Sequence, residues 1–362
     1  MRIFKPAMSS REPSLSSCEW DAVLNERIGL QRVGDWQFRS LDAHPWLPVG
    51  NRSVYGGTFL GWAVEAACRT VDPKFGIHSF HSKFLDRAVS EHVDLFVTNL
   101  REGRSYATRG VEARQHGRLV FTASVSFQVQ EKSSFVYYAK EPDVMPYGAK
   151  EYADSRDGTS PMIVQAVLPP ELGEPGFSRY EKAVRQHDKL HARRKTMIRA
   201  LDEFVSLPFE YRSAVPDMTD ETGYLHRGVK TAFWFRSKGP FEQPLYRQYA
   251  ALVYMIDIVQ LVTMVSGLDP HTNQRPSMLA SLDHTMWYYG SFNIRDWVLM
   301  VPENQAAASG RALVLARFYR GDGTLVAVSM QEGVFRTRDS KPGRDADRAL
   351  PAAEPSEAKS RM

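Results

Sequence analysis

YAALVYMIDIVQLVTMVSG, residues Tyr249 to Gly267, is the stretch on which the fold of this chain depends. It contains no Pro and no Gly before Gly267, which predicts one long helix with Gly267 as its C-cap. At about 1.5 Å per residue the helix spans nearly 30 Å, enough to cross a small domain. Almost every side chain is apolar, a pattern typical of a helix in a protein core or in a bilayer.

Asp257 is the single carboxylate of this helix and lies at its centre. An ionised carboxylate in an apolar core is costly unless it is paired, hydrogen-bonded or shifted in pKa. Asp257 is therefore either an ion-paired structural acid or a working group. The competing interpretation is a membrane span, which would place Asp257 and Gln260 near the bilayer centre at a high cost. No second span is present to shelter them, so we expect no membrane span.

Composition narrows the class of protein. The chain has 362 residues, of which 43% are hydrophobic, enough for two domains or one duplicated fold. The formal net charge is only +4 and no long basic run is present, so we expect no nucleic-acid partner. Cys18 and Cys68 lack metal-ligand spacing and indicate a reducing compartment. We expect neither a metal site nor a cofactor.

A helix followed by antiparallel strands is predicted in the first half of the chain. Residues 1–20 are polar and Ser-rich, so we expect them to be disordered. The glycines of the VYGG motif at 54–57 allow a sharp turn into an Ala-rich helix that Thr58 can cap. Four strands are predicted between 77 and 130, with one of the turns at Gly103.

The second half of the chain repeats the first. HSFH at 78–81 aligns with HTMW at 284–287, and GRLV at 117–120 aligns with GTLV at 323–326. Both alignments have an offset of 206 residues, which indicates a duplicated fold. One long helix wrapped by an antiparallel meander is typical of the hotdog fold. We therefore predict an α+β double hotdog, with two long helices each wrapped by its own antiparallel sheet and the sheets edge to edge.

This organisation predicts five segments. They are a disordered N-terminus (1–20), an N-terminal hotdog (21–130), a connecting segment (131–200), a C-terminal hotdog with the active site (201–337) and a disordered tail (338–362). The connecting segment is rich in Pro, Gly and charge, and a basic helix is expected near its end, around 183–200.

Two motifs in the second half resemble a known family. SLDHTMW, residues 281–287, closely resembles the [ST]-[IL]-D-H-[ST]-M-W signature of the acyl-CoA thioesterase II family. DGTLV at 322–326, followed by QEGV at 331–334, resembles the same family. The VYGG and HSFHS segments of the first half are also similar to family segments. The resemblance covers about residues 20–337, with the connecting segment poorly matched.

The resemblance implies an acyl-CoA thioesterase, which hydrolyses an acyl-CoA to a free acid and CoA, in fatty-acid or secondary-metabolite metabolism. The family's catalytic aspartate, hydroxyl residue and glutamine fall on Asp257, Ser281 and Gln331 of this chain. The hydroxyl residue is usually threonine in the family. Ser281 keeps the hydrogen-bond donor and acceptor but has a looser rotamer.

These residue types suit the attack of water on a thioester carbonyl. Asp257 can take a proton from the water as general base, and Ser281 and Gln331 can orient the water. The repeat places Val125 opposite Gln331, so we expect one active site per chain, in the second half. No G-x-S-x-G motif is present, which argues against a serine nucleophile.

Other polar residues of the matching segments are expected to be structural. We interpret His284 as a structural hydrogen-bonding residue and Asp283 as a capping or turn acid. We interpret His78 and His81 as core or interface histidines.

The first helix departs from the family pattern. Thr58 and Trp62 stand where the family usually has two glutamines, and Trp62 can fill part of an acyl tunnel. Two alternatives therefore stay open. One is a non-catalytic acyl-CoA-binding hotdog protein. The other is an enoyl-CoA hydratase-like hotdog enzyme, which would need a histidine near the start of the helix.

The remaining expectations concern partners and location. The substrate is an acyl-CoA, whose phosphates have Arg87, Arg104, Arg236 and Lys238 as candidate ligands. The resemblance implies a homo-oligomer. The tripeptide SRM at 360–362 resembles the C-terminal peroxisomal signal, so we expect a peroxisomal protein, with the cytoplasm as the alternative.

Overall fold

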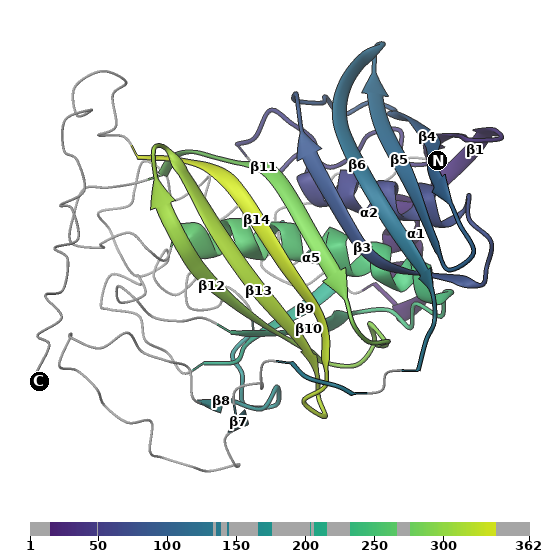
Figure 1. Ribbon diagram of the computed structural model, residues 1–362. Coiled ribbons are helices and arrows are strands. Elements are labelled where there is room, and N and C mark those ends of the chain that lie inside the picture. The colour runs from purple at the N-terminus through teal and green to yellow at the C-terminus, as the bar shows by residue number, and fades with distance from the viewer. Residues whose placement is uncertain are drawn as a thin grey trace, which may run out of the picture.

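Two long helices, α2 (Gly56–Cys68) and α5 (Leu245–Val265), pack against each other and lie on one face of a 12-stranded sheet (Figure 1). This arrangement comes from a computed structural model of the protein. The residues that the structure describes are 15–48, 50–132, 135–138, 143–144, 166–175, 203, 206–215, 232–265 and 276–337.

The first half of the chain begins with one short helix and a pair of antiparallel strands, and its later strands pack against α2. Its other elements are α1 (Ser17–Ile28), β1 (Leu30–Gly34), β2 (Gln37–Ser40), β3 (Phe75–Phe84), β4 (Asp94–Glu102), β5 (Tyr106–Gln115) and β6 (Arg118–Val129). A capping box formed by Ser16 and Glu19 fixes the start of α1. The four strands predicted between 77 and 130 are confirmed.

The second half repeats this plan around α5. Its strands are β9 (Phe209–Ser213), β10 (Phe233–Ser237), β11 (Pro276–Tyr288), β12 (Val298–Ala308), β13 (Arg311–Arg320) and β14 (Leu325–Thr337). A separate parallel pair joins β7 (Asp143–Val144) to β8 (Ala166–Val167).

The order of the strands confirms the duplication. The sheet runs β1-β2-β4-β5-β6-β3-β11-β14-β13-β12-β10-β9, so each half mirrors the other about the β3–β11 pair. These two strands are antiparallel, with His81 opposite Thr285 and Phe80 opposite Met286. The two sheets therefore lie edge to edge as predicted, and each long helix packs against the strands of its own half.

Close approach of α2 to α5 depends on glycine. A Cβ on Gly57 would lie 2.3 Å from the carbonyl oxygen of Tyr254, and one on Gly61 would lie 3.3 Å from that of Ala250. The backbones can therefore touch at Gly57 only because it has no side chain. This contact brings the start of α2 to the middle of α5.

Two details of the predicted helices were wrong. Thr58 does not cap α2, because the helix begins at Gly56 with Tyr55 as its N-cap, and Thr58 is buried inside the first turn. The second long helix begins at Leu245, one turn earlier than the apolar stretch, because Leu, Arg and Gln have favourable helix propensity. Its expected C-cap, Gly267, lies outside the described residues.

Three further expectations are not tested by this structure. The basic helix around 183–200, residues 1–14 and the tail at 338–362 lie outside the described residues, and the five segment boundaries stay predictions. The end of the N-terminal segment that was expected to be disordered is instead ordered, because a capping box at Ser16 and Glu19 starts α1 at Ser17. Within the described part of the chain, no helix has both the length and the apolar character needed to cross a membrane.

Candidate active site

The carboxylate of Asp257 is at the centre of a buried polar cluster. Its Oδ1 accepts hydrogen bonds from Nε2 of Gln331 at 2.6 Å and from Oγ of Ser281 at 3.0 Å. Gln331 Nε2 also donates to Ser281 Oγ at 3.0 Å. The structure thus brings together the three predicted catalytic residues, from α5, β11 and β14.

A fourth group at the site was missed by the sequence prediction. The backbone N–H of Gly57 donates to Oδ2 of Asp257 at 3.0 Å. Gly57 is in the first turn of α2, where backbone N–H groups have no partner within the helix and attract negative charge. The carboxylate of one half therefore caps the long helix of the other half.

Burial changes the acidity of this carboxylate. Asp257 is 1% exposed, and removal from water raises its pKa to about 6, although hydrogen bonds from Ser281, Gln331 and Gly57 act in the opposite direction. No charged partner contributes to this shift. The group can thus be ionised at neutral pH and still accept a proton, which is the property that a general base needs.

The geometry also fixes the orientation of the Gln331 amide. Because Nε2 donates to both Asp257 and Ser281, the other amide atom, Oε1, points elsewhere. Oε1 is buried and has no hydrogen-bond partner among the described residues. It is therefore an available acceptor beside the carboxylate, able to fix the direction of an O–H bond.

Aromatic rings border the site on the side of the first half. A Cβ on Gly56 would lie 2.8 Å from Asp257 Oδ2 and 3.2 Å from the ring of Phe84. From Phe84 the aromatic contacts continue to Phe121 at 5.1 Å between ring centroids. Phe59 stacks on Phe121, and the fully buried Trp62 packs against Phe59. The carboxylate thus lies at the border between a polar cluster and an apolar one.

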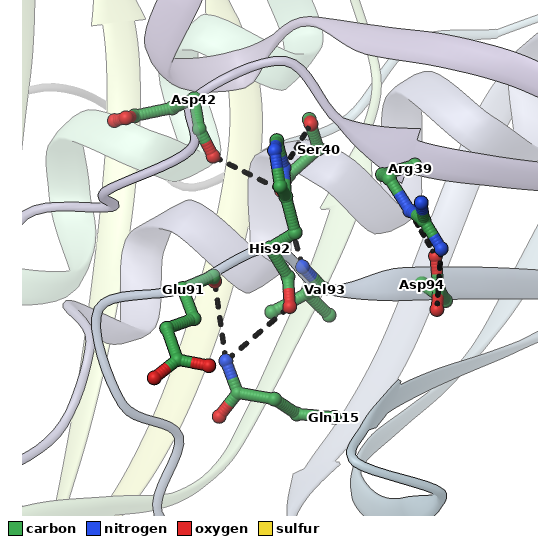
Figure 2. A network of polar contacts seen from close by, with 8 residues as sticks. All are labelled: Arg39, Ser40, Asp42, Glu91, His92, Val93, Asp94 and Gln115. Atoms are coloured by element: carbon green, nitrogen blue, oxygen red, sulfur yellow. Dashed lines mark hydrogen bonds and ion pairs between the residues drawn. The ribbon is translucent and has the colours of Figure 1, made fainter.

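Hydrogen bonds in the first half hold the loop before β4, which contacts the segment that leads into α2. Figure 2 shows the amide of Gln115 reaching the backbone of the loop before β4, where it donates to the carbonyls of Glu91 and His92. The loop is held from its other side by Ser40, whose Oγ accepts from the N–H of Val93 at 3.1 Å.

This loop is in turn bonded to the residues before α2. The N–H of Val54 donates to the carbonyl of Ala88 in this loop at 2.9 Å. The N–H of Tyr55 donates at 3.0 Å to the carbonyl of Trp46, which belongs to the segment between β2 and α2. The first half therefore acts as a scaffold that fixes where the start of α2 meets Asp257.

The remaining singled-out residues do not join the site. His284 is fully buried, but neither of its ring nitrogens has a hydrogen-bond partner among the described residues, so its assignment as a hydrogen-bonding residue was wrong for the side chain. Burial lowers its pKa to about 3, so the ring is neutral. Asp283 pairs with Lys83 of β3 and accepts the N–H of Glu332.

The two histidines of β3 lie on the outer face of the sheet. His78 bonds Ser126 through Nε2 at 2.9 Å and is half-buried. His81 is exposed, and its ring meets Trp287 edge to face across the β3–β11 pair. His81 is thus an interface residue between the two halves and not a core residue.

The four basic candidates for phosphate binding are not gathered in one place. Arg236 and Lys238 lie in and just after β10, near one edge of the sheet, where Arg236 pairs with Glu210. Arg87 and Arg104 follow β3 and β4 in the other half. The binding of CoA phosphates by these four residues thus stays a prediction.

Comparison with known proteins extends over both halves. Residues 43–128 match the family described as "Acyl-CoA thioesterase N-terminal domain", and residues 208–334 match the family described as "Acyl-CoA thioesterase". The two matched regions together cover more than half of the chain and include Gly57, Asp257, Ser281 and Gln331.

Individual relatives agree with these matches. Acyl-coenzyme A thioesterase 8 of Rattus norvegicus is 28% identical over 299 residues, which are 82% of this chain and 83% of that protein. Acyl-CoA thioesterase 2 of Haemophilus influenzae is 27% identical over 321 residues, 87% of this chain and 98% of that protein. The peroxisomal acyl-coenzyme A thioester hydrolase 1 of Saccharomyces cerevisiae is 25% identical over 322 residues, covering 80% and 87%.

Solved structures of other proteins share this fold. The crystal structure of an acyl-CoA thioesterase II from Mycobacterium marinum superposes with a TM-score of 0.61 at 23% identity and covers 88% of this chain and 99% of that one. A protein of hot dog fold from Alicyclobacillus acidocaldarius superposes with a TM-score of 0.60 at 17% identity, covering 87% and 98%. Given the mirrored sheet, the two long helices and the matches in both halves, this chain belongs to the acyl-CoA thioesterase family and has its double hotdog fold.

Proposed function

We propose that this protein hydrolyses acyl-CoA thioesters, with Asp257 as the general base that activates water and with Ser281 and Gln331 as the groups that orient it. The observation that carries the proposal is the buried Asp257 carboxylate, whose raised pKa of about 6 coexists with three directed hydrogen bonds and no charged partner. A structural acid in an ion pair would instead have a basic partner and a lowered pKa.

The reaction follows from these groups. A water molecule placed beside Asp257 gives up a proton to the carboxylate as its oxygen bonds to the thioester carbonyl carbon. Gln331 Oε1, and the lone pair of Ser281 Oγ that does not bond Gln331, can accept the O–H that the water does not give to Asp257, which supplies orientation. The tetrahedral intermediate then expels the CoA thiolate as the C–S bond breaks. The proton held by Asp257 returns to the departing sulfur, leaving a carboxylic acid and CoA.

The first half contributes the start of α2 and an apolar border. The N-terminus of α2 carries partial positive charge, which stabilises the ionised carboxylate and the oxyanion that develops in the same region. The aromatic cluster of Phe84, Phe121, Phe59 and Trp62 begins next to Asp257 and suits an apolar acyl group. Service in fatty-acid or secondary-metabolite metabolism and self-association of the chain stay predictions.

The two alternatives predict different products. A hydratase would add water to a carbon–carbon double bond and leave the thioester intact, whereas a binding protein would release nothing. No histidine side chain has a hydrogen bond to Asp257 among the described residues, which favours the thioesterase over a hydratase with an Asp–His pair.

The test is the release of free CoA, measured with a thiol reagent, from a panel of short to long acyl-CoAs between pH 5 and pH 8. We expect turnover of part of the panel and an acid limb centred near pH 6, because Asp257 must be ionised to accept a proton. Below this midpoint kcat/KM falls about tenfold per pH unit, and above it the rate levels off.

Two outcomes would contradict the proposal. An enoyl-CoA that gains water without release of CoA would identify a hydratase. Stoichiometric binding of acyl-CoAs without turnover at any pH would identify a binding protein. The uncatalysed hydrolysis rate of each acyl-CoA in buffer alone serves as the control.

We also infer a peroxisomal location. It is supported by the relative from Saccharomyces cerevisiae whose name includes that organelle and by the SRM tripeptide at 360–362, which lies outside the described residues. A fluorescent protein fused before residue 1 is expected to colocalise with a peroxisomal marker and to become diffuse when residues 360–362 are removed. A diffuse signal from the intact fusion would instead support the cytoplasm.

A further inference from the structure

The hydroxyl of Tyr55 bonds the backbone of the turn of α5 that carries Asp257. Tyr55 is the residue before α2, and its side chain is buried. Its hydroxyl donates to the carbonyl of Tyr254 at 2.6 Å and accepts from the N–H of Ile258 at 3.2 Å. These two backbone groups are four residues apart, the pair that an ordinary α-helical hydrogen bond would join. The Tyr55 hydroxyl therefore bridges the ladder of α5 around Asp257.

The same turn is held a second time by α2. Gly57 lies two residues after Tyr55 and donates its N–H to Oδ2 of Asp257 at 3.0 Å. Close packing keeps both contacts in place, since a Cβ on Gly57 would lie 2.6 Å from the ring of Tyr55. The start of α2 thus bonds the backbone of the turn through Tyr55 and its carboxylate through Gly57.

The ring of Tyr55 is itself fixed. Trp46 meets it at 5.1 Å between ring centroids, and Tyr254 meets it edge to face at 5.2 Å. Its backbone N–H is bonded to the carbonyl of Trp46. The hydroxyl consequently has little freedom, and a group with little freedom can define the position of its partners to a fraction of an ångström.

We propose that Tyr55 is a positioning residue, whose hydroxyl holds the 254–258 turn of α5 against the start of α2 so that the Asp257 carboxylate meets the Gly57 N–H, Ser281 and Gln331 at the same time. This inference rests on the proposed role of Asp257 as base. Tyr55 does not touch the reacting atoms, and it acts only through the backbone of α5.

Removal of the hydroxyl has a defined physical result. Without it, the Ile258 N–H and the Tyr254 carbonyl lose their bonds to the start of α2 and keep only partners within α5. The backbone of this turn is then no longer bonded to the start of α2, so Asp257 moves relative to Gly57 and the carboxylate loses a hydrogen bond that favours its ionised form. A displacement of about 1 Å at a catalytic group can cost up to about a hundredfold in rate.

Among the titratable groups that act on Tyr55, Asp257 is the one whose pKa lies near neutral pH. Asp257 and Tyr254 of α5 and Tyr211 of β9 are the groups that act on it electrostatically. Burial raises the pKa of all three tyrosines, so they stay neutral. Asp257 in turn is shifted by Ser281, Gln331 and Gly57, none of which is charged.

Tyr211 provides a matched control. It is a second buried tyrosine whose hydroxyl donates to a carbonyl of the same helix, that of Met255, at 2.8 Å. It reaches α5 from β9 and not from α2. Replacement of either tyrosine by phenylalanine removes one buried hydroxyl that bonds α5, but only Tyr55→Phe removes the link to the start of α2.

The experiment compares wild type, Tyr55→Phe, Tyr211→Phe and Asp257→Asn by kcat, KM and the pH profile of CoA release. For Tyr55→Phe we expect kcat to fall about tenfold and KM to change by less than about twofold. Its acid limb should move upward by about half a pH unit. Tyr211→Phe should stay within about twofold of wild type in kcat, with an unmoved acid limb.

Each other outcome has a separate meaning. If Tyr55→Phe and Tyr211→Phe have the same kcat and acid limb while Asp257→Asn is inactive, the positioning role is wrong and the proposed base stands. If Asp257→Asn keeps its activity, the proposed mechanism itself fails. A Tyr55→Phe chain that fails to fold while Tyr211→Phe folds would also overturn the inference, because the hydroxyl would then serve the fold and not the position of Asp257.

Discussion

Asp257→Asn is expected to lower kcat for CoA release by about a hundredfold or more, with a much smaller change in KM. Asparagine has nearly the same shape, and its amide oxygen can still accept the hydrogen bond of Gln331 or Ser281. It cannot accept a proton from water, so the step that generates the nucleophile loses its base. The measurement is steady-state CoA release on the best substrate of the panel.

Asp283→Asn is the matched control for this change. Asp283 is also on the β3–β11 side of the second half, but its carboxylate pairs with Lys83 and contacts the N–H of Glu332, not the polar cluster of Asp257. We expect its turnover to stay within about threefold of wild type. Equal activity of Asp257→Asn and wild type would rule out Asp257 as the base.

Asp257→Asn, which lowers activity, is expected to raise stability at neutral pH. The pKa of Asp257 rises from 3.8 to about 6 on folding, so between these values the folded state holds more protons than the unfolded state. The free energy of unfolding therefore falls as pH rises through this window, by at most about 3 kcal/mol. At pH 7 Asp257→Asn removes the free-energy cost of the buried, ionised carboxylate. At pH 4 the folded wild type is mostly protonated, so there is almost no such cost to remove. Chemical denaturation at both pH values should show a stabilised variant only at the higher one.

Gly57→Ala is expected to have the largest effect on stability. The added methyl group would lie 2.3 Å from the carbonyl oxygen of Tyr254 and 2.6 Å from the ring of Tyr55, so α2 and α5 must move apart. Overpacking of this kind costs about 1–3 kcal/mol, and here it also separates the Gly57 N–H from Asp257. We expect the unfolding free energy to fall by about 3 kcal/mol and CoA release to be lost.

Gly61→Ala tests whether this effect is specific to position 57. Gly61 is one turn further along α2, and a Cβ there would lie 3.1 Å from Ile28 and 3.3 Å from the Ala250 carbonyl, distances that small shifts can relieve. Alanine also favours the helix by about 1 kcal/mol over glycine. We expect a stability within about 1 kcal/mol of wild type and retained turnover. A Gly57→Ala variant as stable and active as Gly61→Ala would contradict the predicted contact.

Local patterns in the sequence account for most of the fold. The apolar run of α5, the alternating strands and the offset of 206 residues between the repeats predicted two equivalent halves joined edge to edge. The resemblance in the second half selected Asp257, Ser281 and Gln331, whose side chains meet as expected. The predictions of the fold were confirmed because they depend on periods within short segments and on a repeat of matching motifs, which the sequence shows directly. The catalytic roles of the three residues stay predictions.

The contributions of Tyr55 and Gly57 could not be predicted in the same way. Their contacts with α5 join residues about 200 positions apart, and no local pattern encodes such a pairing. The glycines were interpreted as a turn, whereas they are needed for close approach of two helices. The side chain of His284 was expected to find hydrogen bonds, but burial in the sheet interior depends on tertiary packing that the motif does not specify.

The pairing of β3 with β11 has a consequence for synthesis on the ribosome. The first half emerges first, and until residues 276–288 follow, β3 is an open sheet edge whose backbone groups can recruit other nascent chains. Lys83 is on that edge with an exposed side chain, and a lysine at such a place discourages aggregation. When β11 arrives, Asp283 pairs with the same lysine. The charge of Lys83 thus discourages aggregation while the chain is incomplete and forms an ion pair across the two halves once the chain has folded.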